Sequence, residues 1–330
     1  TKNKYFDLVD QYLNPIDIDH NEAIIQLDSI LHKSVKDRLL SSDLDVGAFL
    51  SSGIDSSLIV AIASQYVDQL KTFTIKFDGG YDESKLARYT AKQFSTNHHE
   101  LAVSMDLKND VEKILTAYGE PFMDSSAIPS YYISREAKKY LTVVLNGDGA
   151  DELFFGYERF FSIFKNYNVQ SLPYILKYFI YGFDKLFWGN KHINSNSLFS
   201  SQGDAHLHLQ QRFHFDLMHK IFPNLKETFI PENFDIYDYE KPKNKNELLQ
   251  FMRRAEFYGM MQKTLRKVDM ASMHHSLEVR VPFLNKDFID TALTIDPFLN
   301  FKNDSTNKNI LRKIIYKKNK KLNLKNKKKG

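Results

Sequence analysis

One stretch of the sequence, 49–64, constrains the fold more than any other. It reads FLSSGIDSSLIVAIAS, and the apolar run before it starts at Val46. An apolar run, then small hydroxylated residues, then apolar helix formers predict a strand, a tight turn and a helix. Because the first N–H groups of a helix point outward at the positive end of its dipole, such a turn can bind an anion such as phosphate.

The turn contains a glycine, Gly53, and an acid, Asp55. Gly53 lets the backbone approach a ligand closely. An acid beside bound phosphate needs a cation in between, which indicates magnesium on a pyrophosphate group. The GxxxxGK[ST] pattern is absent, so this is not an ordinary P-loop. The structural alternative is a serine-rich helix N-cap that binds nothing.

Composition narrows the class of protein. The 330 residues contain no cysteine, which excludes disulfides, cysteine zinc sites and a cysteine nucleophile from this chain. We find no signal-peptide pattern and no apolar run long enough to cross a bilayer, so a cytoplasmic enzyme is expected. The net charge is +4, and much of the excess lies in the tail at 312–329. Such a tail is typical of a solvated end, with RNA or acidic lipid contact as the alternative.

The order of the elements predicts an α/β fold. Strands alternate with helices up to about residue 160, which is typical of a parallel sheet with helices on both faces and ligands at the carboxyl ends of the strands. The expected helices and strands include a helix at 21–40, strands at 71–77, 101–103 and 141–145, and a long helix at 247–267. The expected division is a linker at 1–20, the α/β core at 21–160 and a mainly helical part at 161–330.

A second polar loop follows the strand expected at 141–145. Residues 145–157 read LNGDGADELFFGY and place Asp148, Asp151 and Glu152 close together. In a parallel sheet this loop lies at the same carboxyl edge as the serine turn. Asp151 could then share a magnesium ion with Asp55, because this cation prefers carboxylate and phosphate oxygens. The alternative is an acidic first turn of a helix, which the dipole also favours.

Together with a third segment, these motifs resemble the asparagine synthetase domain of the PP-loop ATP pyrophosphatases. That family carries SGGxDS after its first strand, an (S/N)G(D/E)G(A/S)DE loop and a KVDRxSMxxSLEVRVPFLD segment. Here the matches are 51–56, 146–152 and 265–284, the last reading LRKVDMASMHHSLEVRVPFL. Weaker matches lie at 73–84, 98–100, 134–140 and 308–312. The resemblance runs from about Asn21 onward and implies a Rossmann-like core of the adenine nucleotide alpha hydrolase type.

The resemblance implies a carbon–nitrogen ligase that uses ATP and Mg²⁺. A carboxylate, aspartate in the leading hypothesis, attacks the α-phosphorus of ATP to give an acyl-adenylate and pyrophosphate. Ammonia, derived from glutamine in a full-length enzyme, then attacks the adenylate to give asparagine and AMP. Positioning and charge neutralisation carry most of such chemistry.

The resemblance also assigns residues position by position. The adenosine would be held by Leu50, Ile75, Asn146 and Gly147. The pyrophosphate and its magnesium would be held by Ser51, Gly53, Asp55 and Ser56, with Asp151 completing the metal site.

Four further residues are carried over as catalytic candidates. Asp148 takes the place of the acid linked to forming the aspartyl-AMP intermediate. Arg135 faces the substrate or pyrophosphate, or else is an exposed helix arginine. Glu278, paired with Arg280, is expected to support the wall of the active site. Lys328 is the best match to the family lysine that stabilises the charged transition state.

The sequence departs from the family pattern in three places. Ser52 stands where the motif has its second glycine, and a side chain there could crowd the pyrophosphate or disfavour a positive φ. The chain ends where the lysine loop begins. Family members also start with a glutaminase domain that has an N-terminal cysteine, and too few residues precede the core here. We therefore expect a fragment of a longer amidotransferase that uses free ammonia by itself.

The motifs leave the acceptor open. Relatives amidate uronic acids of surface polysaccharides or close β-lactam rings. Another PP-loop enzyme, such as a tRNA-modifying ligase, is disfavoured by the SLEVRVPFL segment, and an inactive ATP-binding domain is a further alternative. The expected partners are small-molecule substrates and a glutaminase domain in cis or in trans. Nucleic acid and a membrane span are not expected, and a homodimer stays open.

Overall fold

The computed structural model describes residues 16–77, 83–120, 122, 124–189, 198–210, 215–224, 236–239, 241–300 and 307–322. Its strands are β1 (Val46–Phe49), β2 (Lys71–Phe77), β3 (Asn97–Val103), β4 (Val143–Leu145) and β5 (Glu278–Arg280). Its first helices are α2 (His20–Leu40), α3 (Ile54–Ala63), α4 (Ser84–Gln93), α5 (Leu107–Tyr118), α6 (Ala127–Ala137), α7 (Ala150–Leu153), α8 (Glu158–Gln170) and α9 (Tyr174–Trp188). The later helices are α11 (Gln202–Gln210), α12 (Phe215–Ile221), α13 (Lys245–Ala255), α14 (Met261–Met273), α15 (Lys286–Thr294) and α16 (Asn309–Lys318). Three short turns complete them: a π-helical turn η1 (Glu256–Met260) and 3₁₀ turns η2 (Pro282–Leu284) and η3 (Pro297–Asn300).

The five strands form one parallel sheet in the order β3-β2-β1-β4-β5. Phe49 of β1 is in register with Phe73 of β2, and Ala48 is in register with Leu145 of β4. The α/β prediction is therefore confirmed. Because all strands run the same way, the segments that follow β1 and β4 leave the sheet at the same edge.

The sheet contains a strand that the sequence analysis did not foresee. β5 comes from the segment expected to be mainly helical, and it pairs with β4 through Val143↔Glu278 and Leu145↔Arg280. The C-terminal part of the chain thus completes the sheet.

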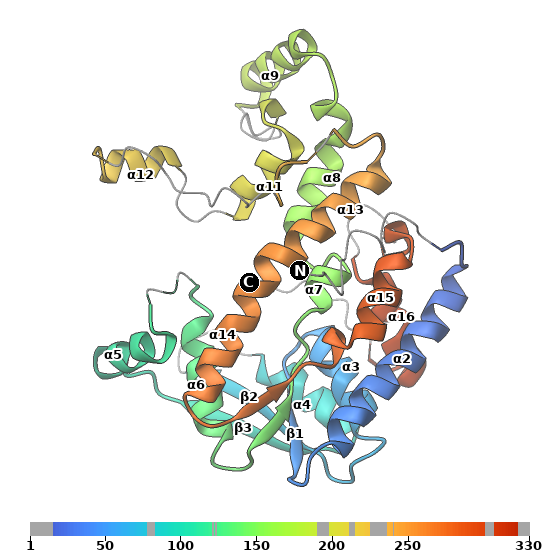
Figure 1. The fold of residues 1–330 in the computed structure, drawn as a ribbon, viewed down its shortest axis with the longest axis vertical. Coiled ribbons are helices and arrows are strands. Elements are labelled where there is room, and N and C mark those ends of the chain that lie inside the picture. Colours follow the sequence, from blue (N-terminus) through green and yellow to red (C-terminus); the bar gives the residue numbers. More distant parts are fainter. Residues whose placement is uncertain are drawn as a thin grey trace, which may run out of the picture.

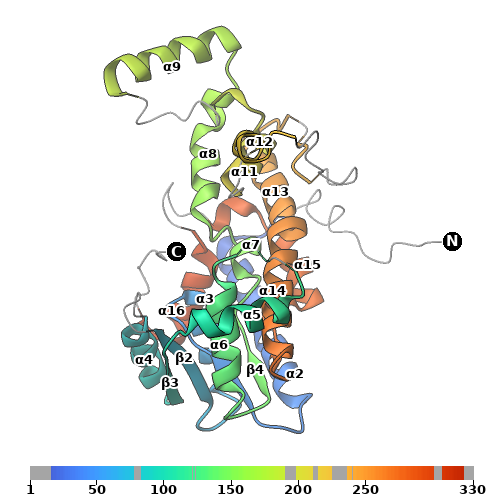
Figure 2. The ribbon, with the colours of Figure 1, turned by 90° about the vertical axis from the view of Figure 1, so that its left-hand side faces the viewer.

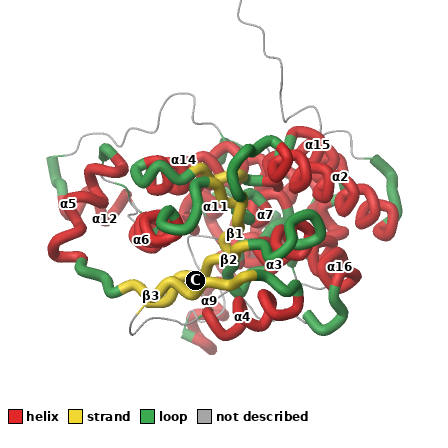
Figure 3. Tube along the Cα trace, turned by 90° about the horizontal axis from the view of Figure 1, so that it is seen from below, coloured by secondary structure: helices red, strands yellow, loops and turns green. Residues whose placement is uncertain are grey.

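Helices cover both faces of the sheet (Figure 3). On one side α6 packs on β2 and β3, and α14 packs on α6 and β5. On the other side α3 packs on β1, and α4 packs on β2 and β3. An outer layer of α2, α15 and α16 lies over α3, since α2 contacts α3, α15 and α16. The α2 helix is capped at its start by Asp19, whose side chain accepts hydrogen bonds from the N–H groups of Asn21 and Glu22.

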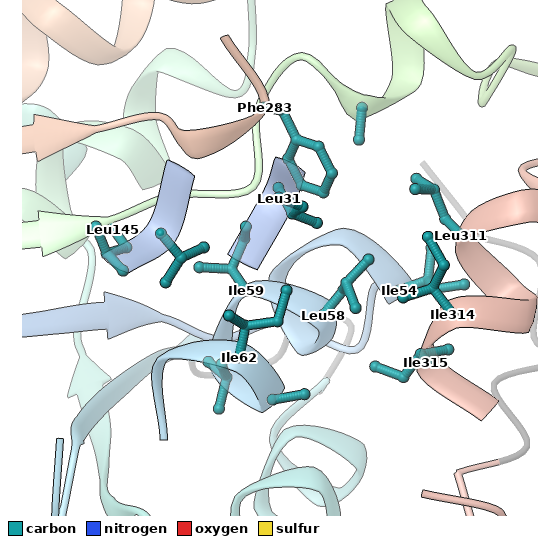
Figure 4. Close-up of a cluster of buried hydrophobic side chains, with 14 of the residues drawn as sticks. Leu31, Ile54, Leu58, Ile59, Ile62, Leu145, Phe283, Leu311, Ile314 and Ile315 are labelled. Carbon is teal, nitrogen blue, oxygen red and sulfur yellow. The ribbon is translucent and has the colours of Figure 1, made fainter. Parts of the chain in front are cut away.

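The α3 helix is the centre of the main core. Every residue from Ile54 to Ala63 is buried. Figure 4 shows Leu58, Ile59 and Ile62 of α3 between the sheet residue Leu145 on one side and side chains of α16 on the other. A helix that is buried on every side is held by contacts all round it, so packing fixes its position and that of the turn before it.

A mainly helical part extends from the carboxyl edge of the sheet. The α7 helix follows β4 at this edge, and α8, α9 and α11 lead away from it (Figures 1 and 2). The long helix expected at 247–267 is present as α13 and α14, with the π-helical turn η1 between them. Among the described helices, we find none that combines the length and the apolar character needed to span a bilayer.

Candidate active site

The serine turn has the geometry that its sequence predicts. β1 ends at Phe49, and α3 begins after Gly53. Gly53 has an extended backbone (φ −76°, ψ 151°), and because it has no side chain it forms no capping hydrogen bond. The hydroxyl of Ser56 accepts a hydrogen bond from the Ser51 N–H (3.1 Å) and lies 3.0 Å from the Ser51 hydroxyl. The turn is therefore closed by its own serines, and it presents the N-terminus of a buried helix at the edge of the sheet.

The serine at position 52 is accommodated without a left-handed backbone. Five described residues other than glycine have a positive φ, and Ser52 is not one of them. Its N–H donates to the Glu83 carboxylate, with N and Oε2 3.1 Å apart. The turn thus binds an anionic oxygen from its own chain, which is the chemistry expected of a phosphate-binding turn.

The acidic loop after β4 lies directly against the serine turn. The Asn146 N–H donates to the Arg280 carbonyl of β5 (2.9 Å), and its side-chain amide donates to the Asp148 carboxylate (2.7 Å). A Cβ on Gly147 would lie 2.8 Å from the Ser56 nitrogen. Only glycine permits this approach, so the two motifs are in backbone contact although about 90 residues separate them.

The two predicted metal-binding acids converge on one cation. The Lys308 ammonium lies 2.6 Å from Asp55 Oδ2 and 2.5 Å from Asp151 Oδ1. The side chains of Lys308 and Asp55 are 5% and 9% exposed, and that of Asp151 is 16% exposed. The two carboxylates, one from each motif, therefore both contact the same positive charge.

This donor set fits magnesium held together with phosphate. Among the described residues, no group of three or more histidine, cysteine or acidic side chains could hold a metal ion by itself. Magnesium is usually bound through one or two carboxylates plus substrate phosphates, and Asp55 and Asp151 bring two carboxylates together here, on either side of the Lys308 ammonium.

A buried acid lies next to Asp151. Glu152 is 1% exposed and accepts a hydrogen bond from the Tyr157 hydroxyl (2.6 Å). Burial, together with the charge of Asp151, raises the pKa of Glu152 to about 7. Burial beside Glu152 also raises the pKa of the Tyr157 hydroxyl, which therefore stays protonated as a donor.

The remaining nucleotide candidates lie on neighbouring strands at this edge. Leu50 is 2% exposed, and its N–H donates to the Phe73 carbonyl of β2 (2.8 Å). Ile75 is in β2, two residues beyond Phe73, and is partly buried. The structure therefore brings the nucleotide candidates and both metal candidates to one edge of the sheet.

Two catalytic candidates, Arg135 and Glu278, form ion pairs outside the serine turn and the acidic loop. Arg135 of α6 forms ion pairs with Asp110 of α5 (3.3 Å) and with Glu136 (3.0 Å). Glu278 begins β5 opposite Val143, the first residue of β4, so it lies at the amino edge of the sheet. It accepts from Arg280 (2.7 Å), as the expected pair requires. Lys328 lies outside the described residues.

Two residues at this site, Lys308 and Gly156, were not among the candidates predicted from the sequence. A Cβ on Gly156 would overlap Asp151 Oδ1 and Lys308 Cε, so this glycine makes room for the ion pair. The available signal was the KNILR segment at 308–312, which begins with this lysine. Nothing in the sequence indicates that this lysine reaches Asp55, 253 positions earlier.

Comparison with known proteins agrees with these observations. The family model described as asparagine synthase matches residues 26–330. Asparagine synthetase (glutamine-hydrolyzing) 1 of Bacillus subtilis (strain 168) is 31% identical over 327 residues, covering 91% of this chain and 48% of that protein. A putative asparagine synthetase (glutamine-hydrolyzing) 2 of Methanocaldococcus jannaschii is 38% identical over 162 residues, covering 48% of this chain and 31% of that protein.

The chain thus spans about half the length of the B. subtilis relative and a smaller share of the archaeal one. The family model nevertheless covers nearly the whole chain, and the two acids that contact Lys308 come from the motifs that first suggested the resemblance. The chain belongs to the asparagine synthase family.

Proposed function

We propose that this chain catalyses ATP-dependent amide synthesis, converting aspartate, ATP and ammonia to asparagine, AMP and pyrophosphate through β-aspartyl-AMP. The observation that carries the proposal is the meeting of the serine turn and the acidic loop, whose acids Asp55 and Asp151 contact one buried cation. Family membership supports the same reaction class.

In this proposal the serine turn binds the pyrophosphate part of ATP. The N-terminus of α3 and the hydroxyls of Ser51 and Ser56 donate to phosphate oxygens, and Gly53 keeps the backbone accessible. Leu50 and Ile75 form the adenosine side with Asn146 and Gly147. Holding the α-phosphorus at the sheet edge presents it to the incoming carboxylate.

The residues of the acidic loop help, through a bound cation, to neutralise the negative charge of the bound phosphates. Asp55 and Asp151 would hold magnesium, which, when bound, offsets the negative charge of the phosphates. Asp148 is oriented by the Asn146 amide (2.7 Å) and is proposed to act in forming the acyl-adenylate. Lys328 is proposed to stabilise the charge that develops at the reacting phosphate. For Arg135 and Glu278, the ion pairs favour a structural role over contact with substrate.

The nitrogen donor and the setting are part of the proposal. The chain itself would use ammonia, and a glutaminase domain, in cis or in trans, would release it from glutamine. We place the enzyme in the cytoplasm, where ATP and aspartate are available. Residues 1–20 are proposed as a linker, 21–160 as the nucleotide-binding core and 161–330 as the part that completes the site.

The test is pyrophosphate release from ATP and magnesium in the presence of ammonium. The acceptor panel contains aspartate, glutamate and an N-acetylated uronic acid. Asp55→Ala is the site variant, and Asp287→Ala, whose carboxylate is exposed and 3.7 Å from Lys33, is the matched control. Release with aspartate that Asp55→Ala loses and Asp287→Ala retains supports the proposal.

Two other outcomes would replace this function. Release with the sugar acid alone would assign the chain to polysaccharide amidation by the same chemistry. No release with any acceptor, while ATP still binds, would make the chain a nucleotide-binding domain without ligase activity.

A further inference from the structure

The Lys308 side chain lies where the proposed metal ion would bind. Its ammonium contacts carboxylates from both motifs, Asp55 at 2.6 Å and Asp151 at 2.5 Å, and the residue is 4% exposed. A lysine buried this deeply between two acids contributes one positive charge against two negative ones. The three side chains together thus carry a net charge of −1 when all are ionised.

Several features of the chain hold Lys308 in this position. Its backbone is left-handed (φ 51°, ψ 34°), a conformation that is rare for lysine, and it directly precedes α16. The neighbouring Asn307 side chain donates to the Gly156 carbonyl (2.7 Å). Gly156 in turn lacks the Cβ that would overlap the lysine and Asp151. Strained backbone of this kind clusters at functional sites.

Electrostatics decides what happens when a metal ion approaches the same carboxylates. Magnesium binds carboxylate oxygens at about 2.0–2.1 Å, so it would take the place that the ammonium now occupies. Two cations at one buried position repel strongly, because screening by water is weak there. The ammonium and the metal ion are therefore alternatives unless new anionic oxygens arrive to bind one of them.

We propose that Lys308 competes with Mg²⁺ for Asp55 and Asp151, so that the metal enters this site efficiently only together with a polyphosphate. The phosphate oxygens then accept the Lys308 ammonium, and the carboxylates are released to the metal. This inference rests on the metal site of the proposed function and adds an order of binding to it. Lys308 is a binding residue in this scheme, and its action is to exclude the bare ion.

The test measures Mn²⁺ binding to the protein by calorimetry and by the electron paramagnetic resonance signal of free Mn²⁺. Lys308→Met removes the charge and keeps most of the side-chain length. Lys308→Gln is a second neutral variant whose amide still donates to a carboxylate, so it preserves more of the folded contacts. Lys308→Arg retains the charge. Lys286→Met is the control, because that lysine pairs with Asp290 on the surface of α15.

We expect both neutral variants to bind Mn²⁺ alone at least about tenfold more tightly than the wild type, because two carboxylates without their ammonium attract a divalent cation more strongly. Lys308→Arg and Lys286→Met should bind as the wild type does. The wild type should gain Mn²⁺ affinity when α,β-methylene-ATP is added, and the neutral variants should gain less. Unchanged or weaker Mn²⁺ binding in both neutral variants would overturn the proposal.

A further pair of variants separates this inference from the proposed function. Asp55→Asn, alone and combined with Lys308→Gln, should abolish the Mn²⁺ binding in question. If Asp55→Asn changes nothing, the metal site itself is misassigned, and the proposed function loses its basis. If Asp55→Asn abolishes binding while Lys308→Gln leaves it unchanged, the metal site stands and only the competition is wrong.

Discussion

Gly147 lies against the backbone of Ser56 so closely that a Cβ on Gly147 would fall 2.8 Å from the Ser56 nitrogen. This contact joins the acidic loop to the N-terminus of α3. It sets how far the carboxylates of the acidic loop lie from the serine turn. Any residue larger than glycine must push the two loops apart.

Gly147→Ala should therefore lower pyrophosphate release roughly 10- to 100-fold, because a small displacement of reacting groups costs this much in rate. The nearest atoms are the Ser56 nitrogen, the Asp55 carbonyl carbon and the Asp55 Cβ, none of which can move away by a side-chain rotation. Steady-state kinetics with varied ATP measures the change. Gly182→Ala is the control, since a Cβ there meets no atom within 4 Å. Equal activity of both variants would show that the two loops adjust freely.

Glu152→Gln should change how stability depends on pH. The raised pKa of about 7 means that the folded state holds a proton that the unfolded state, near the ordinary value of 4.5, has lost. Wild-type stability should therefore fall by up to about 3 kcal/mol relative to Glu152→Gln as the pH rises from 4.5 to 7. Urea unfolding of both proteins across this range measures the difference. Parallel curves would show that Glu152 is charged at neutral pH.

Glu256→Gln should destabilise the helical part strongly. The Glu256 carboxylate is fully buried and accepts from both Arg159 (2.5 Å) and His206 (2.7 Å). Burial opposes its charged form, but hydrogen bonds from His206 and Arg159 hold the pKa of Glu256 below its ordinary value. Removing one partner of a buried charge pair costs about 3–5 kcal/mol.

Unfolding by urea at pH 7 measures this loss for Glu256→Gln. The wild type should have a larger free energy of unfolding than Glu256→Gln at pH values above the unfolded pKa of Glu256. This difference should shrink as the pH falls below 4.5 toward the lower folded value, because protonation then removes the same charge. Glu158→Gln, at an exposed position in the first turn of α8, is a control that should change stability little. A loss of less than about 1 kcal/mol for Glu256→Gln would contradict the buried pair.

Glu278→Gln should leave activity within about threefold of the wild type. Its side chain is 52% exposed and pairs with Arg280 at the amino edge of the sheet, while the serine turn lies at the carboxyl edge. Exposed ion pairs contribute about 0–1 kcal/mol, so stability should change little. Asp148→Asn, in the acidic loop, should lose most of its activity in the same assay. A comparable loss in both variants would restore Glu278 as a catalytic candidate.

Local sequence patterns predicted the parts of the fold that local physics determines. The strand at 71–77 is present with the expected bounds because β-branched and aromatic residues stand between turn residues. The helix expected at 21–40 is present as α2, and it starts where the Asp19 side chain bonds to nearby N–H groups. The serine turn and the acidic loop are adjacent because parallel strands end at a common edge.

Features that depend on distant contacts were not predictable in this way. β5 is three residues long and partly exposed, and its sequence is too short to establish a repeating alternation of apolar and polar residues. It forms a strand because it pairs with the edge of β4. The π-helical turn at Glu256–Met260 interrupts a helix, and the single glycine in it, Gly259, does not distinguish such a turn from a continuous helix. The role of Lys308 depends on a contact across 253 positions, and no local pattern indicates such a contact.

The late position of β5 and Lys308 in the sequence has a consequence for how the protein is made. β1 and the serine turn leave the ribosome before β5 does, and β4 has no neighbour on one side until residue 278 has been synthesised. At about 5–20 residues per second, the roughly 130 residues between β4 and β5 take on the order of ten seconds to add. During that time the nascent sheet presents an unpaired edge, which is where pairing with another chain begins. Chaperone binding during synthesis should therefore matter more for this protein than for one whose sheet closes with neighbouring strands.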